Sequence, residues 1–201
     1  MFRLAGKILV TLFAVASLCF GAVLYRSPDP LYTAAELISC GRFHKYDDVI
    51  RDVAAKHGVD PLLIKAVVWR ESEFEPGKVG TSGERGLMQV SEAAARDWVR
   101  ANKAETFAPT DLFSPRMNLE IGTWYLKKAL VRYATKDDPA AFALAEYNAG
   151  KKRVDRWVTK TNLGASATAD DLKSSIDFPK TRRYVDAILK RREFYRERGE
   201  L

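Results

Sequence analysis

One glutamate in the chain stands where a carboxyl group could act as a proton donor. Glu71 follows the apolar segment Leu62 to Arg70, and Asp60-Pro61 before that segment is typical of a helix start. A partly buried carboxylate at the C-terminal end of a helix is disfavoured as an anion, so we expect a raised pKa for Glu71. A glycosidase acid needs this property, because it must keep its proton until a leaving oxygen takes it. Taken alone, a glutamate at a helix end is more often a solvated surface residue.

Four short motifs in a fixed order change this interpretation. They are Glu71-Ser72, Gly86-Leu87-Met88-Gln89, Glu146-Tyr147-Asn148-Ala149-Gly150 and the segment Phe178 to Val185. Over residues 46–198 their order and spacing resemble the catalytic domain of the soluble lytic transglycosylases, a family with a goose-type lysozyme-like fold. Each motif alone is a weak signal. Together they indicate an all-α domain similar to that family.

The resemblance implies roles for seven residues. Glu71 would be the catalytic acid and base, and the substrate-binding residues would be Ser72, Met88, Gln89, Tyr147, Asn148 and Tyr184. Gln89 would hydrogen-bond substrate or support its loop, and Tyr147 and Asn148 would stand opposite Glu71. Such assignments suit a sugar ligand, because buried amides need hydrogen-bond partners and a sugar offers many hydroxyl and amide groups. Core packing for Met88 and helix packing for Tyr184 remain open alternatives.

Several positions depart from the family pattern. Gly80 stands where many members carry a serine, Val90-Ser91-Glu92 replaces a Met-Pro segment, Glu146 replaces an alanine, and Lys180 replaces an acidic residue. None of these changes removes the acid. We therefore expect an altered subsite shape and substrate preference rather than loss of activity.

The resemblance implies a peptidoglycan lytic transglycosylase, which cleaves the β-1,4 bond between MurNAc and GlcNAc without water and leaves a 1,6-anhydroMurNAc end. Ordinary glycosidases use two carboxylates, whereas the motifs supply one. Two alternatives stay open: a lysozyme-type hydrolase with Glu84, Glu92 or Asp97 as second carboxylate, and a non-catalytic wall-binding protein of the same fold. We expect no cofactor and no metal, because His44 and His57 lack a convincing ligand pattern.

Helical periodicity and chain breakers outline the elements that would position these residues. Apolar residues at helical spacing predict helices over residues 47–57, 62–70, 86–89, 93–99, 118–133, 139–150, 151–159 and 181–198. The glycines and the proline of residues 75–85 predict a loop. Residues 160–178, rich in Thr, Ser, Ala, Asp and Gly, predict a flexible surface loop or lid. The sequence has no convincing alternating strand pattern, so we expect an all-α fold.

The N-terminal residues are typical of an export signal. Residues 8–25 hold no charged side chain, and Arg3 and Lys7 precede them. A run of about 18 uncharged residues is just long enough to span a bilayer, so residues 1–27 favour a retained signal-anchor over a cleaved signal peptide. Residues 28–45 would then be a juxtamembrane linker and residues 46–201 the catalytic domain. The positive-inside rule places that domain outside the cytoplasm, anchored in the inner membrane or secreted to the periplasm.

Composition limits the partners. The 201 residues, 47% of them hydrophobic, can build one solid core. A net charge of +7 would suit nucleic acid, but export makes peptidoglycan glycan strands and an anionic membrane surface the expected partners, with no nucleic acid. We expect the N-terminal apolar helix to contact the membrane. One of the two cysteines lies in that apolar segment, which excludes a disulfide within the exported domain. The sequence does not predict an oligomeric state.

Overall fold

Helices dominate the part of the chain that the computed structural model describes, which is residues 2–104 and 106–201, with side chains from residue 11 onward. The chain forms two compact units, Met1–His44 and Lys45–Leu201. The helices are α1 (Phe2–Arg26), α2 (Pro30–Ile38), α3 (Asp47–His57), α4 (Pro61–Ser72), α5 (Glu92–Asn102), α6 (Pro115–Arg132), α7 (Pro139–Ala149), α8 (Lys151–Lys160), α9 (Ala169–Ser175) and α10 (Pro179–Glu197), with short 3-10 helices at Arg42–His44, Pro109–Phe113 and Gly164–Ser166. Extended pairing in the described residues is limited to isolated bridges. The predicted all-α fold is confirmed.

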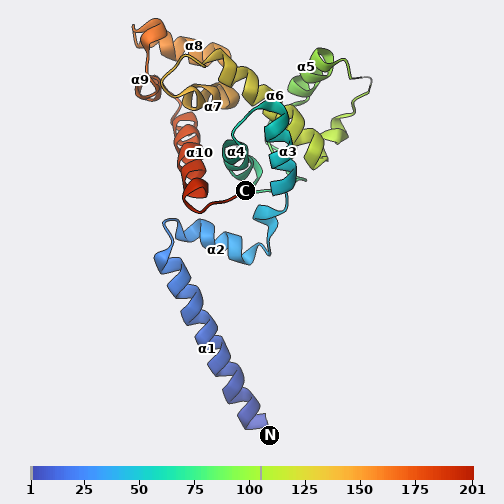
Figure 1. Ribbon diagram of the computed structural model, residues 1–201, viewed down its shortest axis with the longest axis vertical. Coiled ribbons are helices and arrows are strands. Elements are labelled where there is room, and N and C mark those ends of the chain that lie inside the picture. Colours follow the sequence, from blue (N-terminus) through green and yellow to red (C-terminus); the bar gives the residue numbers. More distant parts are fainter. Residues whose placement is uncertain (1, 105) are drawn as a thin grey trace. The chain divides into compact units, whose positions relative to one another are not determined.

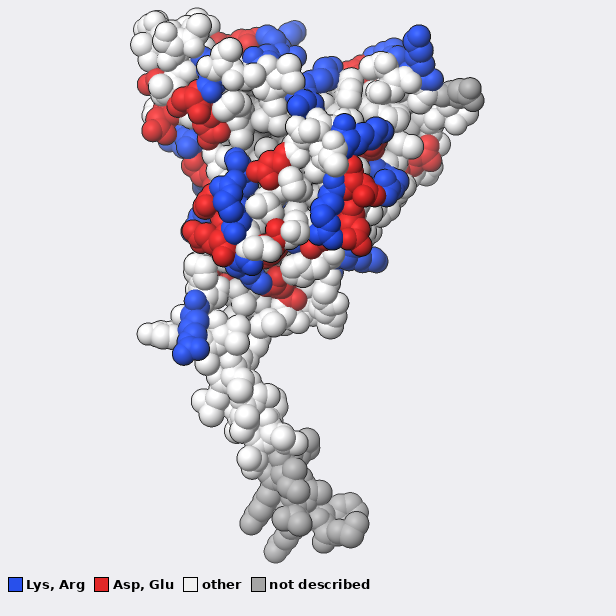
Figure 2. Space-filling model, in the orientation of Figure 1, with Lys and Arg blue, Asp and Glu red and all other residues white. Residues whose placement is uncertain are grey.

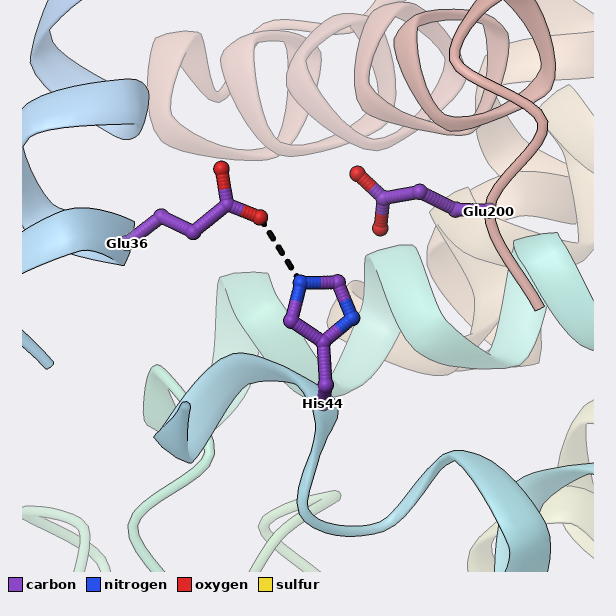
Figure 3. A group of neighbouring side chains, drawn as sticks. All are labelled: Glu36, His44 and Glu200. Carbon is purple, nitrogen blue, oxygen red and sulfur yellow. Dashed lines mark hydrogen bonds and ion pairs between the residues drawn. The ribbon is translucent and has the colours of Figure 1, made fainter. Parts of the chain in front are cut away.

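The first unit has ordered structure beyond α1. The Asp29 side chain accepts a hydrogen bond from the Tyr32 backbone N–H at 3.0 Å, which caps α2. The rings of Tyr32 and Phe43 pack with their centroids 5.2 Å apart. His44 Nε2 and Glu36 Oε1 lie 2.8 Å apart (Figure 3). Residues 28–45, predicted as a linker, therefore contain a capped helix and a 3-10 helix.

The structure describes the side chains of the N-terminal apolar segment only from residue 11 onward. Among the described residues, no helix reaches the length and apolarity that a bilayer crossing needs. Residues 8–10, where the predicted signal-anchor begins its uncharged run, lie outside the described side chains.

Two helices whose middle residues are apolar on all sides, apart from Lys65 in α4, form the centre of the second unit. Residues 63–68 of α4 and residues 140–145 of α7 are all buried. A helix without a polar face must be covered all round. Accordingly, α4 packs against α3 and α10 (Figure 1), and α7 packs against α6, α8 and α10. Glu71 and Tyr147, near the C-terminal ends of these helices, are only partly buried, so they lie at the edge of the core.

Side-chain caps start both central helices at the predicted positions. The Asp60 side chain accepts the Leu62 N–H at 2.9 Å, and the Asp138 side chain accepts the Ala140 N–H at 3.1 Å. A proline occupies the first turn of each helix. The predicted starts of these helices are therefore confirmed, since the cap satisfies N–H groups that lack helical partners.

A buried lysine ties α4 to the end of the chain. Lys65 is fully buried, and its Nζ lies 2.9 Å from Asp47 Oδ1 and 2.9 Å from Glu200 Oε2. The same ammonium lies 5.2 Å from the centroid of the Tyr195 ring. Two carboxylates and an aromatic face thus replace the water that a buried ammonium ion loses.

Two local predictions were wrong. Residues 86–89 form turns rather than a helix, because Gly86 and Gln89 have φ angles of 78° and 48°, which a right-handed helix excludes. Residues 160–178 are not one open loop, since they include α9. Thr168 Oγ1 accepts the Asp171 N–H at 3.2 Å, and the Asp171 carboxylate accepts the Thr168 N–H at 2.9 Å. This reciprocal capping box fixes the start of α9.

Charges of both signs share the surface of the second unit. On the face shown in Figure 2, Lys and Arg side chains lie among Asp and Glu side chains rather than in one continuous field. On this face the excess of positive charge is therefore not concentrated into the stripe that a nucleic-acid site requires.

Candidate active site

Glu71 lies in the last turn of α4, where the chain leaves the helix abruptly. Glu73 and Phe74 have φ angles of 54° and 63°, and the Glu73 N–H bonds to Trp69 O at 3.0 Å. The Phe74 side chain is fully buried and anchors the turn. The acid is thus carried by a rigid helix end rather than by a mobile loop.

Burial is the main cause of an unusual pKa at Glu71. It raises the pKa of this carboxyl from 4.5 to about 7, and the Glu84 carboxylate adds to the increase. The Tyr184 hydroxyl donates a hydrogen bond to Glu71 Oε1 at 2.6 Å and, like the Arg70 and Lys78 cations, lowers the pKa. The predicted increase is confirmed. Near neutral pH the group can therefore both give and take a proton.

A buried asparagine holds the loop that faces the acid. Asn118, on α6, accepts the Met88 N–H at 2.7 Å through Oδ1 and donates through Nδ2 to Arg85 O at 2.7 Å and Leu112 O at 2.8 Å. All its amide groups are thereby used. A Cβ atom at Gly86 would lie 2.3 Å from Asn118 Nδ2, so this close approach requires glycine.

Ser72 and Met88 support the site from inside the core. The Ser72 hydroxyl, 2.8 Å from Leu87 O and 3.1 Å from Val68 O, connects α4 to the loop. The Met88 side chain is fully buried, and its Sδ lies 2.6 Å from the position of a Cβ at Gly122. The structure therefore places both predicted substrate-binding side chains in structural positions.

Gln89 lines the cleft while stabilising its own loop. Its Nε2 donates to Lys78 O at 3.1 Å and to Gly86 O at 3.0 Å. A Cβ atom at Gly80 would lie 2.7 Å from Gln89 Oε1 and 2.5 Å from Glu84 Oε2. A serine at Gly80 would therefore require the ends of both side chains to move.

Two tyrosines gather around the acid, one from α7 and one from α10. Tyr147 donates its hydroxyl proton to Met88 O at 2.9 Å, and burial raises the pKa of both Tyr147 and Tyr184. The Glu71 carboxylate raises both pKa values further, so all three groups share one electrostatic environment. Asn148 is exposed, and its Oδ1 accepts the Thr181 hydroxyl at 2.8 Å. Asn148 thus joins α7 to α10.

A cleft of about 470 Å³ runs beside these residues. It is lined by Glu84, Gln89, Val90, Ser91, Ala93, Ala94, Asp97, Gly122, Tyr125, Ala129, Glu146, Tyr147, Gly150 and Lys151. Glu84 and Tyr147 both interact electrostatically with Glu71, so the acid lies next to the cleft wall. A cleft with polar and apolar walls and one protonated carboxyl suits the cleavage of a glycosidic bond.

The other acids of the cleft are mostly engaged by neighbours. Tyr125 donates its hydroxyl proton to Asp97 at 2.5 Å, and Tyr133 donates to Glu146 at 2.8 Å. Arg100 pairs with Asp97, and Arg132 pairs with Glu146. The Glu84 carboxylate accepts a hydrogen bond from the Ser82 N–H at 3.1 Å.

Sequence reasoning missed Asn118 and Tyr125. Asn118 left one signal, because it is a polar residue directly beside Leu119 and Ile121 in an apolar helix. No sequence signal distinguishes Tyr125, because an aromatic residue at helical spacing is typical of a hydrophobic core. Both act through contacts made far along the chain.

Known proteins resemble this arrangement. Residues 48–169 match the family model described as the transglycosylase SLT domain. The chain is 31% identical over 148 residues to membrane-bound lytic murein transglycosylase F of Desulfosudis oleivorans, covering 71% of this chain and 31% of that protein. It is 34% identical over 131 residues to membrane-bound lytic murein transglycosylase C of Shigella sonnei, covering 62% of this chain and 36% of that protein.

A solved structure shares the fold. The 70 kDa soluble lytic transglycosylase of Escherichia coli matches with a TM-score of 0.66 and 28% identity, over 77% of this chain and 25% of that one. The chain therefore spans only about a third or less of the length of these proteins. The likeness confirms the lysozyme-like helical fold expected from the motifs, and the goose-type relationship stays a prediction.

Proposed function

Because the chain belongs to the transglycosylase SLT domain family, we propose that it is a lytic transglycosylase that cleaves peptidoglycan between MurNAc and GlcNAc. The observation that carries the proposal is Glu71, whose pKa is raised to about 7 beside a cleft, with Tyr184 hydrogen-bonded to it at 2.6 Å. At neutral pH a large share of this carboxyl is protonated. It can therefore act as general acid without a second titrating group.

The proposed reaction has two steps. Glu71 gives its proton to the glycosidic oxygen of the leaving GlcNAc while the N-acetyl oxygen of MurNAc attacks C1, so the C1–O bond breaks as a new C1–O bond forms. The Glu71 carboxylate then takes the proton of the C6 hydroxyl, and O6 displaces the acetyl oxygen from C1. The product is a 1,6-anhydroMurNAc end, and Glu71 is protonated again. Tyr184 would hold the carboxyl in place throughout, and Gln89 and Tyr147 would shape the cleft for the sugar.

Hydrolysis is the second candidate, and Glu84 favours it. This side chain lines the cleft and raises the pKa of Glu71. Of the three carboxylates predicted as possible partners, Glu92 pairs with Arg96, and Asp97 is held by Tyr125. If water attacked C1, Glu84 would be the base. Glu84→Gln would then abolish activity, whereas the transglycosylase proposal expects it to survive with an altered pH dependence.

We further propose that the enzyme acts in the cell envelope, outside the cytoplasm. The lytic murein transglycosylases F and C named above are described as membrane-bound, and residues 1–27 carry the features of an export signal. Whether that segment anchors the chain or is removed is tested by the mass and membrane partitioning of the chain recovered from cells.

Mass spectrometry of digested sacculi tests the activity. The full chain should release fragments whose MurNAc ends are lighter by one water than hydrolysis products. Glu71→Gln should lose this activity, and Glu73→Gln, which removes an exposed carboxylate two residues away, should keep it. Ordinary reducing ends would establish hydrolysis. Unchanged cleavage by Glu71→Gln would remove Glu71 from the mechanism.

A further inference from the structure

The helix α2 exposes its apolar side and buries part of its polar side. Leu31, Ala35 and Ile38, which we call the apolar face of α2, follow the spacing of one helix face and are exposed. Leu31 is 85% exposed and Ile38 is 73% exposed, whereas Thr33, on the other side of the helix, is buried. A surface helix in water normally has the opposite arrangement. The apolar face therefore has the character of a contact surface for an apolar partner.

Contacts inside the first unit fix this orientation of α2. The Tyr32 ring packs against the Phe43 ring, with the centroids 5.2 Å apart. The Glu36 carboxylate lies 2.8 Å from His44 Nε2 (Figure 3). Both contacts join the other side of α2 to the 3-10 helix that follows it. A rotation of α2 that turned its apolar face inward would break them.

A hydrogen-bonded corner joins α2 to the end of α1. Residues 27–29 separate the two helices. The hydroxyl oxygens of Ser27 and Thr33 lie 2.7 Å apart, and Ser27 Oγ also accepts the Asp29 N–H at 3.1 Å. The Thr33 N–H donates to Asp29 O at 3.0 Å. These bonds hold α2 across the end of α1, as Figure 1 shows.

The exposed apolar residues of α1 continue to this corner and indicate what covers the apolar face. Leu18, Val23 and Tyr25 are large, apolar and exposed. Tyr25 and Arg26 end α1, and both residue types are common where acyl chains meet lipid headgroups. In α2, whose residues are all described, Glu36 is the one charged residue, and it lies off the apolar face. A lipid surface therefore suits both the chemistry of the apolar face and its place beside α1.

We propose that α2 lies in the headgroup region of a lipid bilayer, with its apolar face toward the acyl chains. Residues 30–38, expected from the sequence to belong to a linker, are then a membrane-surface helix. Such a helix lies along the bilayer and does not need to cross it. The inference goes beyond the proposed lytic activity and rests on the proposed location in the cell envelope.

Cys40, exposed and two residues beyond the apolar face, provides the reporter for the test. In the full chain carrying Cys19→Ser, a thiol-reactive, environment-sensitive fluorophore labels Cys40 alone. The labelled chain is added to vesicles of phosphatidylethanolamine and phosphatidylglycerol, and its emission should shift to the blue. The reference carries the same fluorophore at Lys103→Cys, an exposed position of the second unit, in a chain with both native cysteines replaced by serine. Lipids with a nitroxide near the headgroup should quench the Cys40 label about threefold more strongly than this reference.

A double variant separates the apolar face from the rest of the chain. Leu31→Ser/Ile38→Ser changes two exposed side chains, so the melting temperature should stay unchanged. The chain should still sediment with vesicles through α1, while quenching of the Cys40 label falls to the level of the reference. The matched control is Val131→Ser/Leu163→Ser, which removes exposed apolar side chains of the second unit. The control should keep the blue-shifted emission and the strong quenching.

Four results would overturn the inference. The Cys40 label could stay in water while the chain sediments with vesicles, or the full chain could fail to sediment at all. Quenching could also stay unchanged in Leu31→Ser/Ile38→Ser, or fall equally in the control variant. Failure of the proposed lytic activity is a separate outcome, because none of these readings needs a glycan substrate.

Discussion

The raised pKa of Glu71 leads to a stability prediction that needs no substrate. The folded-state pKa of about 7 lies above the ordinary value of 4.5, so the folded chain binds this proton more tightly than the unfolded chain. Its stabilising effect is fully present below pH 4.5 and is lost as pH rises through about 7. At alkaline pH the fold must hold a partly buried anion.

The size of the effect follows from the pKa difference. Raising a pKa from 4.5 to about 7 corresponds, at 1.36 kcal/mol for each pH unit, to about 3 kcal/mol. Partial exposure of Glu71 reduces this to about 2–3 kcal/mol. Glu71→Gln cannot form this anion. The free energy of unfolding of the variant, relative to wild type, should therefore be about 2–3 kcal/mol higher at pH 8.5 than at pH 5. For a domain of this size the gain corresponds to roughly 5–10 °C in melting temperature.

Urea unfolding of wild type and Glu71→Gln at pH 5 and pH 8.5 measures the difference. Glu73→Gln removes the same charge from an exposed position and reports the effect of net charge alone. The reasoning is refuted if the stability difference between Glu71→Gln and wild type is the same at both pH values. The pKa of Glu71 would then not be raised in the folded protein.

Three further substitutions test other parts of the structure. Tyr184→Phe removes a hydrogen bond that lowers the pKa of Glu71, so the alkaline limb of the kcat/KM profile should move up by roughly half to one pH unit. Gly86→Ala should cost roughly 2–4 kcal/mol in urea unfolding, because alanine opposes the positive φ and would press on Asn118. Lys65→Met leaves two carboxylates without their buried cation, and thermal unfolding should show a loss of about 3 kcal/mol.

Local signals were sufficient for much of the helical framework. The Asp-Pro pairs before α4 and α7 fixed the starts of those helices, because cap and proline act within one turn. The capping box at Thr168 and Asp171 is just as local. The predicted lid over 160–178 overlooked it, because the composition of the whole segment was weighed above a four-residue signature.

The turns at residues 86–89 were beyond local reasoning, although the glycines and the proline of residues 75–85 correctly predicted a loop there. Gly86 to Gln89 look helical because leucine, methionine and glutamine favour helices. Their turns depend on Asn118, which is 30 residues from the Met88 N–H that it accepts. The pairing of Glu71 with Tyr184 spans 113 residues. The motifs predicted both residues as members of the site, but only the packing of α4 against α10 shows that their side chains are in contact.

The Ser72 hydroxyl connects the proposed acid and the cleft loop in one cooperative unit. It reaches Val68 O within α4 and Leu87 O in the loop, so the helix end and the loop share a single proton donor. Local unfolding of either element removes a partner from the other. In hydrogen exchange, the Met88 amide should therefore open together with the last turn of α4. A state that keeps the acid in place while the loop is released would lose the hydrogen bond between Ser72 and Leu87 O, so this bond favours opening of the two elements together.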